Sequence, residues 1–584
     1  MSAVLEAREP SARYLEAVQP ALVRQFGLLA TAPGAVVRLR KLILTLAVQG
    51  KVVQQDPGDV PAGELLRRIR NERTALIAAG LIKQDKPAAP ISSEEEPCPL
   101  PRGWAWVRFG DLIHELCTGP FGSLIYKKDY VSGGVPLINP SHMIHGRIEH
   151  DPDVSVSALM ASQLAAYRLS AGDVLLARRG EMGRYALVTE REAGWLCGTG
   201  SFFLKLFKAY DRRFFGLTLE DPRLRQHLLG ESVGATMTNL NQRILLDAVV
   251  AVAPLAEQAR IVARVDELMR LCDALEAQGR LEAEQHARLL GTLLGTLTDS
   301  TTPEELAANW QRVADHFDLL LDRPEAVDAL EQTILQLAVR GLLVPQDPSD
   351  EPATALIQKI LAVKEHLVLT GRRKRERALH PNVDGAKPFD LREGWTWVRL
   401  QEVCDVRDGT HDTPKYHDTG VPLVTSKNLS SGRLDLTDVK LISAADHTAI
   451  SARSKVDHDD ILFAMIGSIG NPVLVDTDIE FSIKNVALFK QYDRALSDPR
   501  YLLLSLTVAA GEMKAKAAGG VQAFVSLGQI RNTTMAIPPL AEQGRIVNRV
   551  TELRRLCADL RQRVTASQTT QSHLANALVD LAVA

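Results

Sequence analysis

The sequence predicts an α+β protein, in which two α/β domains are separated by long antiparallel coiled-coil helices in a tandem internal repeat with pseudo-two-fold symmetry. Three observations support this fold class. The chain of 584 residues matches itself when it is shifted by about half of its length. Each half carries short β-branched runs in its middle, and each half closes with a long segment of helical periodicity.

The repeat is visible as matched blocks at both ends of each half. At a shift of 291 residues, the block 43–50 (ILTLAVQG) falls on 334–341 (ILQLAVRG), and 103–108 (GWAWVR) falls on 394–399 (GWTWVR). At a shift of 285 residues, the motif PLAEQ recurs. Each half therefore has a constant front, a divergent middle and a constant back.

The fronts, at about 12–80 and 303–370, are each predicted to form a helix, a turn and a second helix. Apolar residues follow helical spacing in both fronts, and an Asp-Pro pair at 56–57 and 347–348 interrupts them. Pro-rich or charged linkers follow. The basic run 372–375 is interpreted as a solvated face rather than a contact with phosphates.

The middles, at 100–240 and 391–530, are predicted to be α/β domains because short β-branched runs alternate with turn residues. The expected strands lie at 135–138, 173–177 and 185–188 in the first copy and at 421–424, 460–464 and 472–475 in the second. A Gly-x-x-Gly pair follows the second of these runs in both copies. It is interpreted as a tight turn rather than a phosphate-binding loop.

The backs are predicted to be long helices that pair as a coiled coil. Their apolar residues follow alternating steps of four and three, and about 40 residues at 1.5 Å each would form a rod of roughly 60 Å. Pro254 and Pro539 suit the first helical position. Glu257 and Glu542 lie in the first turn, where the helix dipole favours an acid.

The composition excludes several classes of protein. With 46% hydrophobic and 24% charged residues, the chain is expected to be globular rather than disordered. No apolar stretch of about 18 residues and no apolar leader is found, so neither a membrane span nor secretion is expected. Six cysteines without a Cys-x-x-Cys pair fit a reducing cytoplasm, and Cys272 and Cys557 lie at coiled-coil seam positions where packing is expected.

Motifs of catalysis are not found. The sequence has no P-loop, no H-E-x-x-H, no G-x-S-x-G and no Asn/Asp-Pro-Pro-aromatic string of an amino-methyltransferase. We therefore expect a non-catalytic chain without a metal site. The net charge of -3 does not by itself indicate a nucleic-acid binder.

The divergent middles instead offer polar side chains on glycine-bent loops. Such hydroxyls, amides and cations can pair with base edges and phosphates. In the first half the candidate DNA contacts are Thr118, Phe121, Ser123, Lys127, Lys128, Arg178, Arg179, Arg184, Asn239, Gln242 and Arg243. In the second half they are Thr410, His411, Thr413, Lys415, Tyr416, Lys427, Asn428, Lys484, Gln529 and Arg531. Basic and acidic residues balance in both middles, so a partner is expected to supply further phosphate contacts.

The order of these motifs resembles the specificity subunit of type I restriction-modification systems. Leu-Ala-Val-x-Gly, Gln-Asp-Pro, Gly-Trp-x-Trp-Val-Arg, Gly-Val-Pro-Leu and Pro-Leu-Ala-Glu-Gln-x-Arg-Ile-Val carry the resemblance over nearly the whole chain, and Asp-Gly-Thr-His starts at Asp408. The resemblance implies that the middles are target recognition domains, each of which reads one half of a split sequence in double-stranded DNA. Because 118–123 reads TGPFGS where the second copy has DGTH, the two half-sites should differ.

The resemblance also implies partners and their cofactors. Two methyltransferase subunits would dock on the helical blocks, with restriction or translocase subunits added where the system cleaves DNA. S-adenosylmethionine, ATP and magnesium would be bound by those partners and not by this chain. The expected boundaries are 1–99 for the first helical block, 100–240 for the first recognition domain, 241–302 for the central long helix, 303–390 for the second block, 391–530 for the second recognition domain and 531–584 for the last helix.

Two other functions remain open from the residues alone. A stand-alone sequence-specific DNA-binding regulator would need no partner, although the chain lacks a helix-turn-helix signature. A structural coiled-coil scaffold would leave the polar loops of the middles without a role. Co-purification with a methyltransferase, or tight binding to DNA by the chain alone, separates these alternatives.

Overall fold

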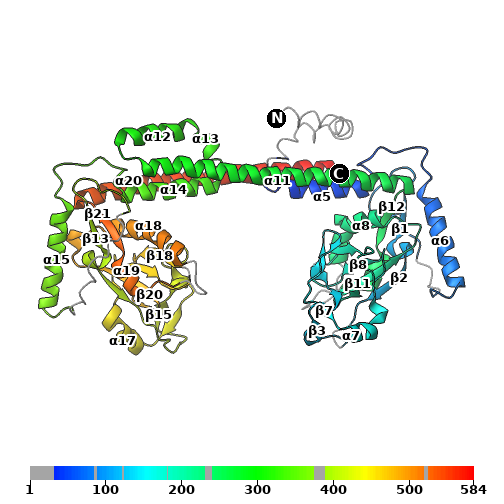
Figure 1. Cartoon of the computed structure of the whole chain (residues 1–584), viewed down its shortest axis with the longest axis horizontal. Coiled ribbons are helices and arrows are strands. Elements are labelled where there is room, and N and C mark those ends of the chain that lie inside the picture. The colour runs from blue at the N-terminus through cyan, green and yellow to red at the C-terminus, as the bar shows by residue number, and fades with distance from the viewer. Residues whose placement is uncertain are drawn as a thin grey trace. The chain divides into compact units, whose positions relative to one another are not determined.

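The chain folds into two compact units, residues 1–281 with 568–584 and residues 282–567. The computed structural model describes residues 30, 32–83, 89–120, 124–180, 182–230, 240–373, 388–467, 469–517 and 524–583. Each unit contains a helical pair, a mixed α/β domain and parts of two long helices (Figure 1). The predicted fold class, a tandem repeat of mixed α/β domains with long helices, is confirmed.

The helical pairs of the fronts lie where the sequence predicts them. In unit 1 they are α5 (Ala35–Val48) and α6 (Ala62–Ala78), and in unit 2 they are α14 (Pro324–Val339) and α15 (Ala353–Leu369). Unit 2 has two more helices before this pair, α12 (Pro303–Asp315) and α13 (Phe317–Leu320). Residues 12–29 of the first front lie outside the described residues.

Each α/β domain is built on a four-stranded antiparallel sheet. In unit 1 its strands are, in spatial order, β2 (Ile113–Thr118), β11 (Ser201–Leu206), β8 (Val174–Ala177) and β9 (Tyr185–Leu187). In unit 2 they are β14 (Cys404–Asp408), β20 (Val486–Gln491), β17 (Ile461–Ala464) and β18 (Gly470–Leu474). The central strands β8 and β17 are buried at every residue, which explains why the sequence shows continuous apolar runs there.

A second, smaller sheet completes each domain. In unit 1 the order is β10 (Leu196–Cys197), β4 (Val135–Ile138), β7 (Ser155–Val156) and β3 (Tyr130–Val131), and in unit 2 it is β16 (Lys440–Ile442), β15 (Val421–Val424) and β19 (Ser482–Ile483). The pair β4/β10 in unit 1 and the equivalent pair β15/β19 in unit 2 are both parallel. All six strands expected from the sequence are present, within three residues of the predicted ends.

A two-stranded ribbon ties each domain to its long helix. β1 (Ala105–Arg108) pairs with β12 (Val249–Val252), and β13 (Thr396–Arg399) pairs with β21 (Thr534–Ile537). The first strand of each ribbon carries the Trp-x-Trp motif, and the second leads into α11 (Leu255–Asp299) or α20 (Leu540–Val583). The ribbon therefore joins the constant blocks that flank each divergent middle.

The long helices pack as predicted, with a third helix added in each unit. α11 begins in unit 1 and ends in unit 2, whereas α20 runs from unit 2 to unit 1. In unit 1, Val265 of α11 shares a core with Val579 of α20 and Leu42 of α5. In unit 2, Leu294 of α11 shares one with Cys557 of α20 and residues of α14. The seam cysteines Cys272 and Cys557 are buried, which confirms their packing role, and burial raises the pKa of both thiols.

The start of each long helix differs by one residue from the prediction. Pro254 and Pro539 precede the helices, and their carbonyl oxygens accept hydrogen bonds from the N–H groups of Gln258 and Gln543 at 2.9 and 3.0 Å. The prolines therefore occupy the N-cap and not the first helical position, because the residue whose carbonyl accepts the first helical hydrogen bond is the N-cap.

The repeated motifs meet in a buried contact that we call the tryptophan–glutamate joint. Trp104 Nε1 donates to Glu257 Oε2 at 3.0 Å, and Trp395 Nε1 donates to Glu542 Oε2 at 3.1 Å. Both glutamates are 1% exposed, and burial raises the pKa of both carboxyls. The sequence offered only the helix dipole as a reason for an acid here, whereas the structure adds a hydrogen bond from a residue 153 positions away.

Further repeated residues close the joint in both units. Gly50 ends the first front helix with φ of 69°, and a Cβ there would lie 2.8 Å from Cζ2 of Trp104. Gly341 stands in the same relation to Trp395, also at 2.8 Å. Arg260 pairs with Asp59 in unit 1. The blocks that recur in the sequence are therefore the ones that form a single packed contact between front, ribbon and long helix.

Candidate nucleic-acid interface

Two loops with different side chains leave equivalent strands of the two domains. The first recognition loop, 118–128, follows β2, and the second recognition loop, 408–416, follows β14. A Cβ at Gly119 would lie 2.2 Å from the carbonyl oxygen of Gly198, and one at Gly409 would lie 2.2 Å from that of Ile483. Both loops therefore need glycine at the same point, where the backbone crosses the end of the parallel strand beside it.

The first recognition loop is held from a distant part of the chain. Gln242, at the start of α10 (Gln242–Asp247), donates from Nε2 to Thr118 Oγ1 at 2.9 Å, so two predicted site residues are in direct contact. Lys127 and Lys128 are exposed in the 3₁₀ turn η2 (Lys127–Asp129). Lys128 Nζ lies 5.5 Å from the ring centroid of Tyr126, an exposed aromatic that the sequence reading did not select. Phe121, Ser123 and Asn239 lie outside the described residues.

Arg178 lies at the same end of the sheet as the first recognition loop. The N–H of Gly119 donates to the carbonyl of Ser201, and the N–H of Arg178 donates to that of Gly200, both at 2.9 Å. The Arg178 guanidinium lies 5.3 Å from the ring centroid of Phe202, and burial together with Arg179 lowers its pKa from the ordinary value. Arg179 is exposed, Arg184 is half-buried, and the Arg243 side chain is 88% exposed.

The second recognition loop gathers four predicted residues around one strand end. Thr410 forms a β-bridge with Lys484, and Lys484 Nζ donates to Thr413 Oγ1. His411 Nε2 lies 2.9 Å from Asp408 Oδ2, and its Nδ1 lies 3.0 Å from Asn485 Oδ1. The His411 side chain remains 57% exposed.

Further along the same loop, Lys415 and Tyr416 are exposed. Three residues that orient the loop were not predicted as site residues, namely Asp408, Arg453 and Asn485. Asp408 was present in the quoted motif. Arg453 and Asn485 carry no local signal because they approach the loop only through the fold.

Two predicted contacts in the second domain are engaged in structural hydrogen bonds. Asn428 is 4% exposed, its Oδ1 accepts from the N–H and hydroxyl of Thr425, and its Nδ2 donates to two backbone carbonyls at 3.0 Å. It closes a 3₁₀ turn with every polar atom of its amide occupied, so we remove it from the candidate interface. Arg531 donates from Nε and Nη2 to the carbonyl of Val406, at 3.1 and 2.6 Å, and thereby anchors β14.

The remaining candidates of the second domain have modest ionic or capping contacts. Lys427 pairs with Asp438 on the surface with 71% of its side chain exposed. Gln529 is exposed and accepts hydrogen bonds at Oε1 from the N–H and hydroxyl of Ser526, both at 2.8 Å, at the start of α19 (Leu527–Asn532). Both side chains can exchange these contacts for contacts with DNA at little cost.

The basic run after α15 is not a solvated face throughout, as the sequence reading expected. The Arg373 side chain is only 11% exposed, Nη2 lies 2.9 Å from Asp405 Oδ1, and the guanidinium lies 4.7 Å from the ring centroid of Tyr492. The expectation is therefore wrong at Arg373, because its side chain contacts a buried carboxylate and an aromatic ring of the second α/β domain. Arg372 is exposed, and Lys374 and Arg375 lie outside the described residues.

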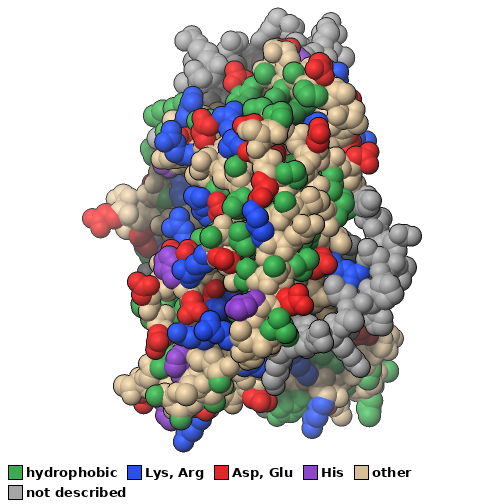
Figure 2. Space-filling model, turned by 90° about the vertical axis from the view of Figure 1, so that its left-hand side faces the viewer, with side chains coloured by type: hydrophobic (Ala, Val, Ile, Leu, Met, Phe, Trp, Pro, Cys, Tyr) green, Lys and Arg blue, Asp and Glu red, His purple; other side chains and the backbone are tan. Residues whose placement is uncertain are grey.

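Charges of both signs are interspersed over the face shown in Figure 2. Within the described ranges, no group of three or more His, Cys, Asp or Glu residues could hold a metal ion. The helices of that same part of the chain include none that is long and apolar enough to cross a membrane. The interface thus offers hydrogen-bonding groups and single cations on loops, which is chemistry suited to reading base edges.

Comparison with known proteins finds one family twice in the chain. The type I restriction modification DNA specificity domain matches residues 101–285 and 392–567. Each match spans one ribbon, one α/β domain and the first part of one long helix. The comparison therefore recovers the same tandem repeat as the internal sequence match.

Full-length relatives cover almost the whole chain. The type I restriction enzyme EcoAI specificity subunit of Escherichia coli is 32% identical over 94% of this chain and 93% of its own length. The EcoEI specificity subunit of Escherichia coli is also 32% identical, with the same coverage. The crystal structure of the HsdS subunit from Thermoanaerobacter tengcongensis is 18% identical over 84% of this chain and 98% of its own, with a TM-score of 0.36.

Proposed function

The chain belongs to the family of type I restriction-modification DNA specificity subunits, and on that premise we propose that its two recognition loops read the two halves of a split, asymmetric DNA sequence. The first target recognition domain reads one half through loop 118–128. The second reads the other half through loop 408–416. The repeated ribbons and long helices set the length of the unread spacer between them.

The observation that carries this proposal is that equivalent loops on a repeated frame differ in chemistry. At the end of β2, the Thr118 hydroxyl accepts a hydrogen bond from the Gln242 amide. At the equivalent end of β14, the Asp408 carboxylate pairs with the His411 imidazole. Amides can pair with adenine, and hydroxyls, imidazoles and cations distinguish other edges in the major groove. Two copies of one scaffold that carry loops of different chemistry fit a DNA site with two different half-sites.

Partner subunits are needed for affinity and for chemistry. The net charge of -3 and the mixed surface leave much phosphate neutralisation to other proteins. We place two methyltransferase subunits on the helical blocks, with restriction or translocase subunits where cleavage occurs. Methyl transfer and cleavage then belong to those partners, which bind S-adenosylmethionine, ATP and magnesium, and the assembly works in the cytoplasm.

Mapping methylated adenines tests the proposal. The chain is produced with the methyltransferase encoded beside it in a host that lacks adenine methylation, and the genome is read by single-molecule sequencing. We expect one split motif with two different halves and a constant spacer. Modified adenines in no common split motif, or tight sequence-specific binding by the isolated chain without any methyltransferase partner, would contradict it.

Gly409→Ala should damage recognition at the second half-site. Because the new Cβ would lie 2.2 Å from the Ile483 carbonyl oxygen, the loop must shift, and each base that is no longer matched costs about 1–3 kcal/mol. The measurement is the methylated motif of the variant. Gly528→Ala is the matched control in the same domain, because the nearest atom to a Cβ there, the Ser526 hydroxyl oxygen, would lie 4.0 Å away. If Gly528→Ala damages recognition of the second half-site as much as Gly409→Ala does, the close approach at Gly409 does not determine recognition.

A further inference from the structure

We infer that Arg453 is a positioning residue for DNA recognition, because it holds the second recognition loop in the shape that reads its half-site. The inference rests on the proposed function and adds a residue that lies outside the loop. Arg453 belongs to α17 (Ala444–Ser454), 45 positions after the residue it contacts.

One nitrogen of Arg453 contacts the loop at three points. Nη2 lies 2.9 Å from Asp408 Oδ1, 2.8 Å from the carbonyl oxygen of Gly409 and 3.3 Å from that of Asp408. These contacts fall on the two residues where the chain leaves β14 and crosses the parallel strand beside it. Arg453 thus holds the backbone at the start of the loop together with a carboxylate.

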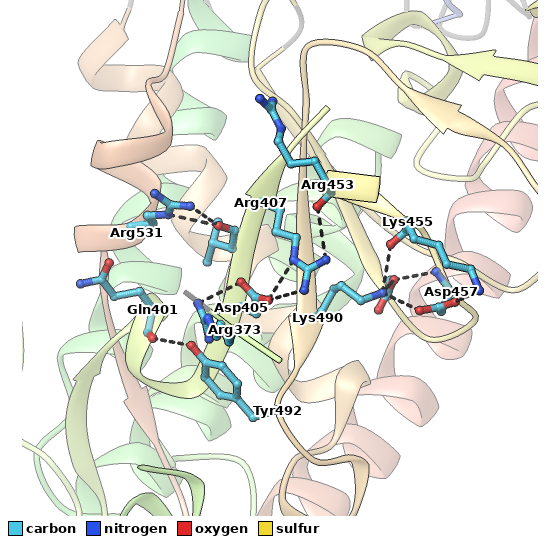
Figure 3. A network of polar contacts seen from close by, with 12 residues as sticks. Arg373, Gln401, Asp405, Arg407, Arg453, Lys455, Asp457, Lys490, Tyr492 and Arg531 are labelled. Carbon is cyan, nitrogen blue, oxygen red and sulfur yellow. Dashed lines mark hydrogen bonds and ion pairs between the residues drawn. The ribbon is translucent and has the colours of Figure 1, made fainter. Parts of the chain in front are cut away.

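Arg453 is itself part of a larger network of polar contacts in the second domain (Figure 3). Arg407 Nη1 donates to the Arg453 carbonyl at 3.2 Å, and Arg407 Nη2 lies 2.8 Å from Asp405 Oδ2. The other oxygen of Asp405 pairs with Arg373 at 2.9 Å. With 12% of Asp405 and 11% of Arg373 exposed, this end of the network is largely shielded from solvent, so solvent screens it little. The backbone of Arg453 is therefore linked through Arg407 and Asp405 to Arg373, which follows α15.

The network decides which groups of the loop are available to DNA. Arg453 occupies Asp408 Oδ1 and His411 occupies Oδ2, so the Asp408 carboxylate is used within the protein and is not a free acceptor for a base. His411 is oriented by Asp408 on one side and by Asn485 on the other, while 57% of its side chain faces solvent. Both ring nitrogens of His411 have partners in the protein, so Asp408, Asn485 and Arg453 fix the position of its exposed ring at the loop.

The effect should be confined to one half-site. In the first domain the equivalent strand end carries Thr118, a neutral hydroxyl that is held by Gln242. The second domain pairs a carboxylate with an arginine, and the first domain pairs a hydroxyl with an amide. The two domains therefore hold equivalent strand ends by different contacts. Loss of Arg453 therefore leaves reading of the first half-site unchanged.

A direct contact between Arg453 and a phosphate is the competing explanation, since 60% of its side chain is exposed. The two roles predict different measurements. A phosphate contact contributes equally to every sequence, so its loss weakens binding uniformly and lowers the salt dependence. A positioning role contributes to discrimination, so its loss reduces the difference between the correct and the altered second half-site.

The test uses the full chain in complex with its methyltransferase subunits. Binding is measured by competition with three duplexes, which carry the mapped motif, an altered first half or an altered second half. For Arg453→Ala we expect discrimination at the second half to fall roughly tenfold and discrimination at the first half to stay as in the parent. Arg453→Lys should recover part of the loss, because an ammonium can still bridge Asp408 and Gly409.

Arg494→Ala is the matched control. Its side chain is 62% exposed and lies 3.8 Å from Asp459, so it removes a similar surface ion pair in the same domain without touching the loop. Urea unfolding of each complex checks the fold. If Arg453→Ala does not fold, Asp408→Asn replaces it, because this variant removes the same ion pair from the other side. Unchanged discrimination, or uniform weakening on all three duplexes, would overturn the inference. If the parent complex itself prefers no split site, the proposed function fails instead.

Discussion

Exchange of residues 113–231 for the equivalent segment of another specificity subunit is expected to change one half of the methylated motif and to leave the other half and the spacer unchanged. The segment starts at the first residue of β2 and ends directly after α9 (Pro222–Gly230). The ribbon β1/β12 and the tryptophan–glutamate joint stay outside it. Each altered base position changes binding by about 1–3 kcal/mol, so the old half-site should be lost entirely.

The structure improves the boundary of this exchange. Gln242, which holds Thr118, lies beyond residue 231, so the shorter segment separates two residues that work together. Extension to 113–247 includes α10 and should give a cleaner change of specificity and a higher methylation level than 113–231. The measurement is again the map of methylated adenines in cells that produce the chimera and its methyltransferase.

The chain contains its own control for the exchange. Residues 404–532, from β14 to the end of α19, are the equivalent segment of the second unit. If they replace 113–247, the motif should contain the second half-site twice. A chimera that changes both halves, or that changes neither, would show that the two domains do not read DNA independently.

Trp104→Phe is expected to lower the free energy of unfolding of unit 1 by about 1–3 kcal/mol, because the buried Glu257 carboxyl loses one of its two side-chain donors and keeps only Gln55. Trp104→Ala should cost about 3–5 kcal/mol, since the cavity adds to the lost hydrogen bond. The Trp104 hydrogen bond lowers the pKa of Glu257 against the larger effect of burial. Without it that pKa rises further above the unfolded value, so the destabilisation should be larger at neutral than at acidic pH.

Trp106→Phe is a closely matched control. The Nε1 atom of Trp106 is buried and has no hydrogen-bond partner in the described part of the chain. Its removal should therefore leave stability unchanged or slightly higher. The same pair of variants exists in unit 2, where Trp395 bonds to Glu542 and Trp397 Nε1 is likewise unpaired among the described residues. Urea unfolding followed by tryptophan fluorescence measures all four, and equal effects within a pair would refute the role of the joint.

Much of the fold could be predicted because its signals are local. Helical periodicity located α5, α14 and the long helices, and the continuous apolar runs located β8 and β17. The internal match located the second copy of every constant block. The errors came where the local signal was ambiguous, as at the prolines that cap the long helices and at Arg373, whose charged neighbours suggested a solvated surface.

The candidate site could be predicted only as a set of polar residues on two loops. The sequence placed Thr118 and Gln242 in the set, but their contact spans 124 positions. It also placed Asn428 there, and the structure shows that residue closing a turn. Arg453 was not selected, because nothing near it in the sequence resembles a recognition loop.

The sequence by itself therefore determined the repeat, the family and the identity of the constant and divergent blocks, because these depend on patterns within short segments. Only the tertiary structure decided which polar atoms are free to read DNA. The fold pairs several of these side chains with others in the chain, and the partners come from residues 45 positions away for Asp408 and 124 for Thr118. That pairing depends on how sheet and helices pack and is not written in any local pattern.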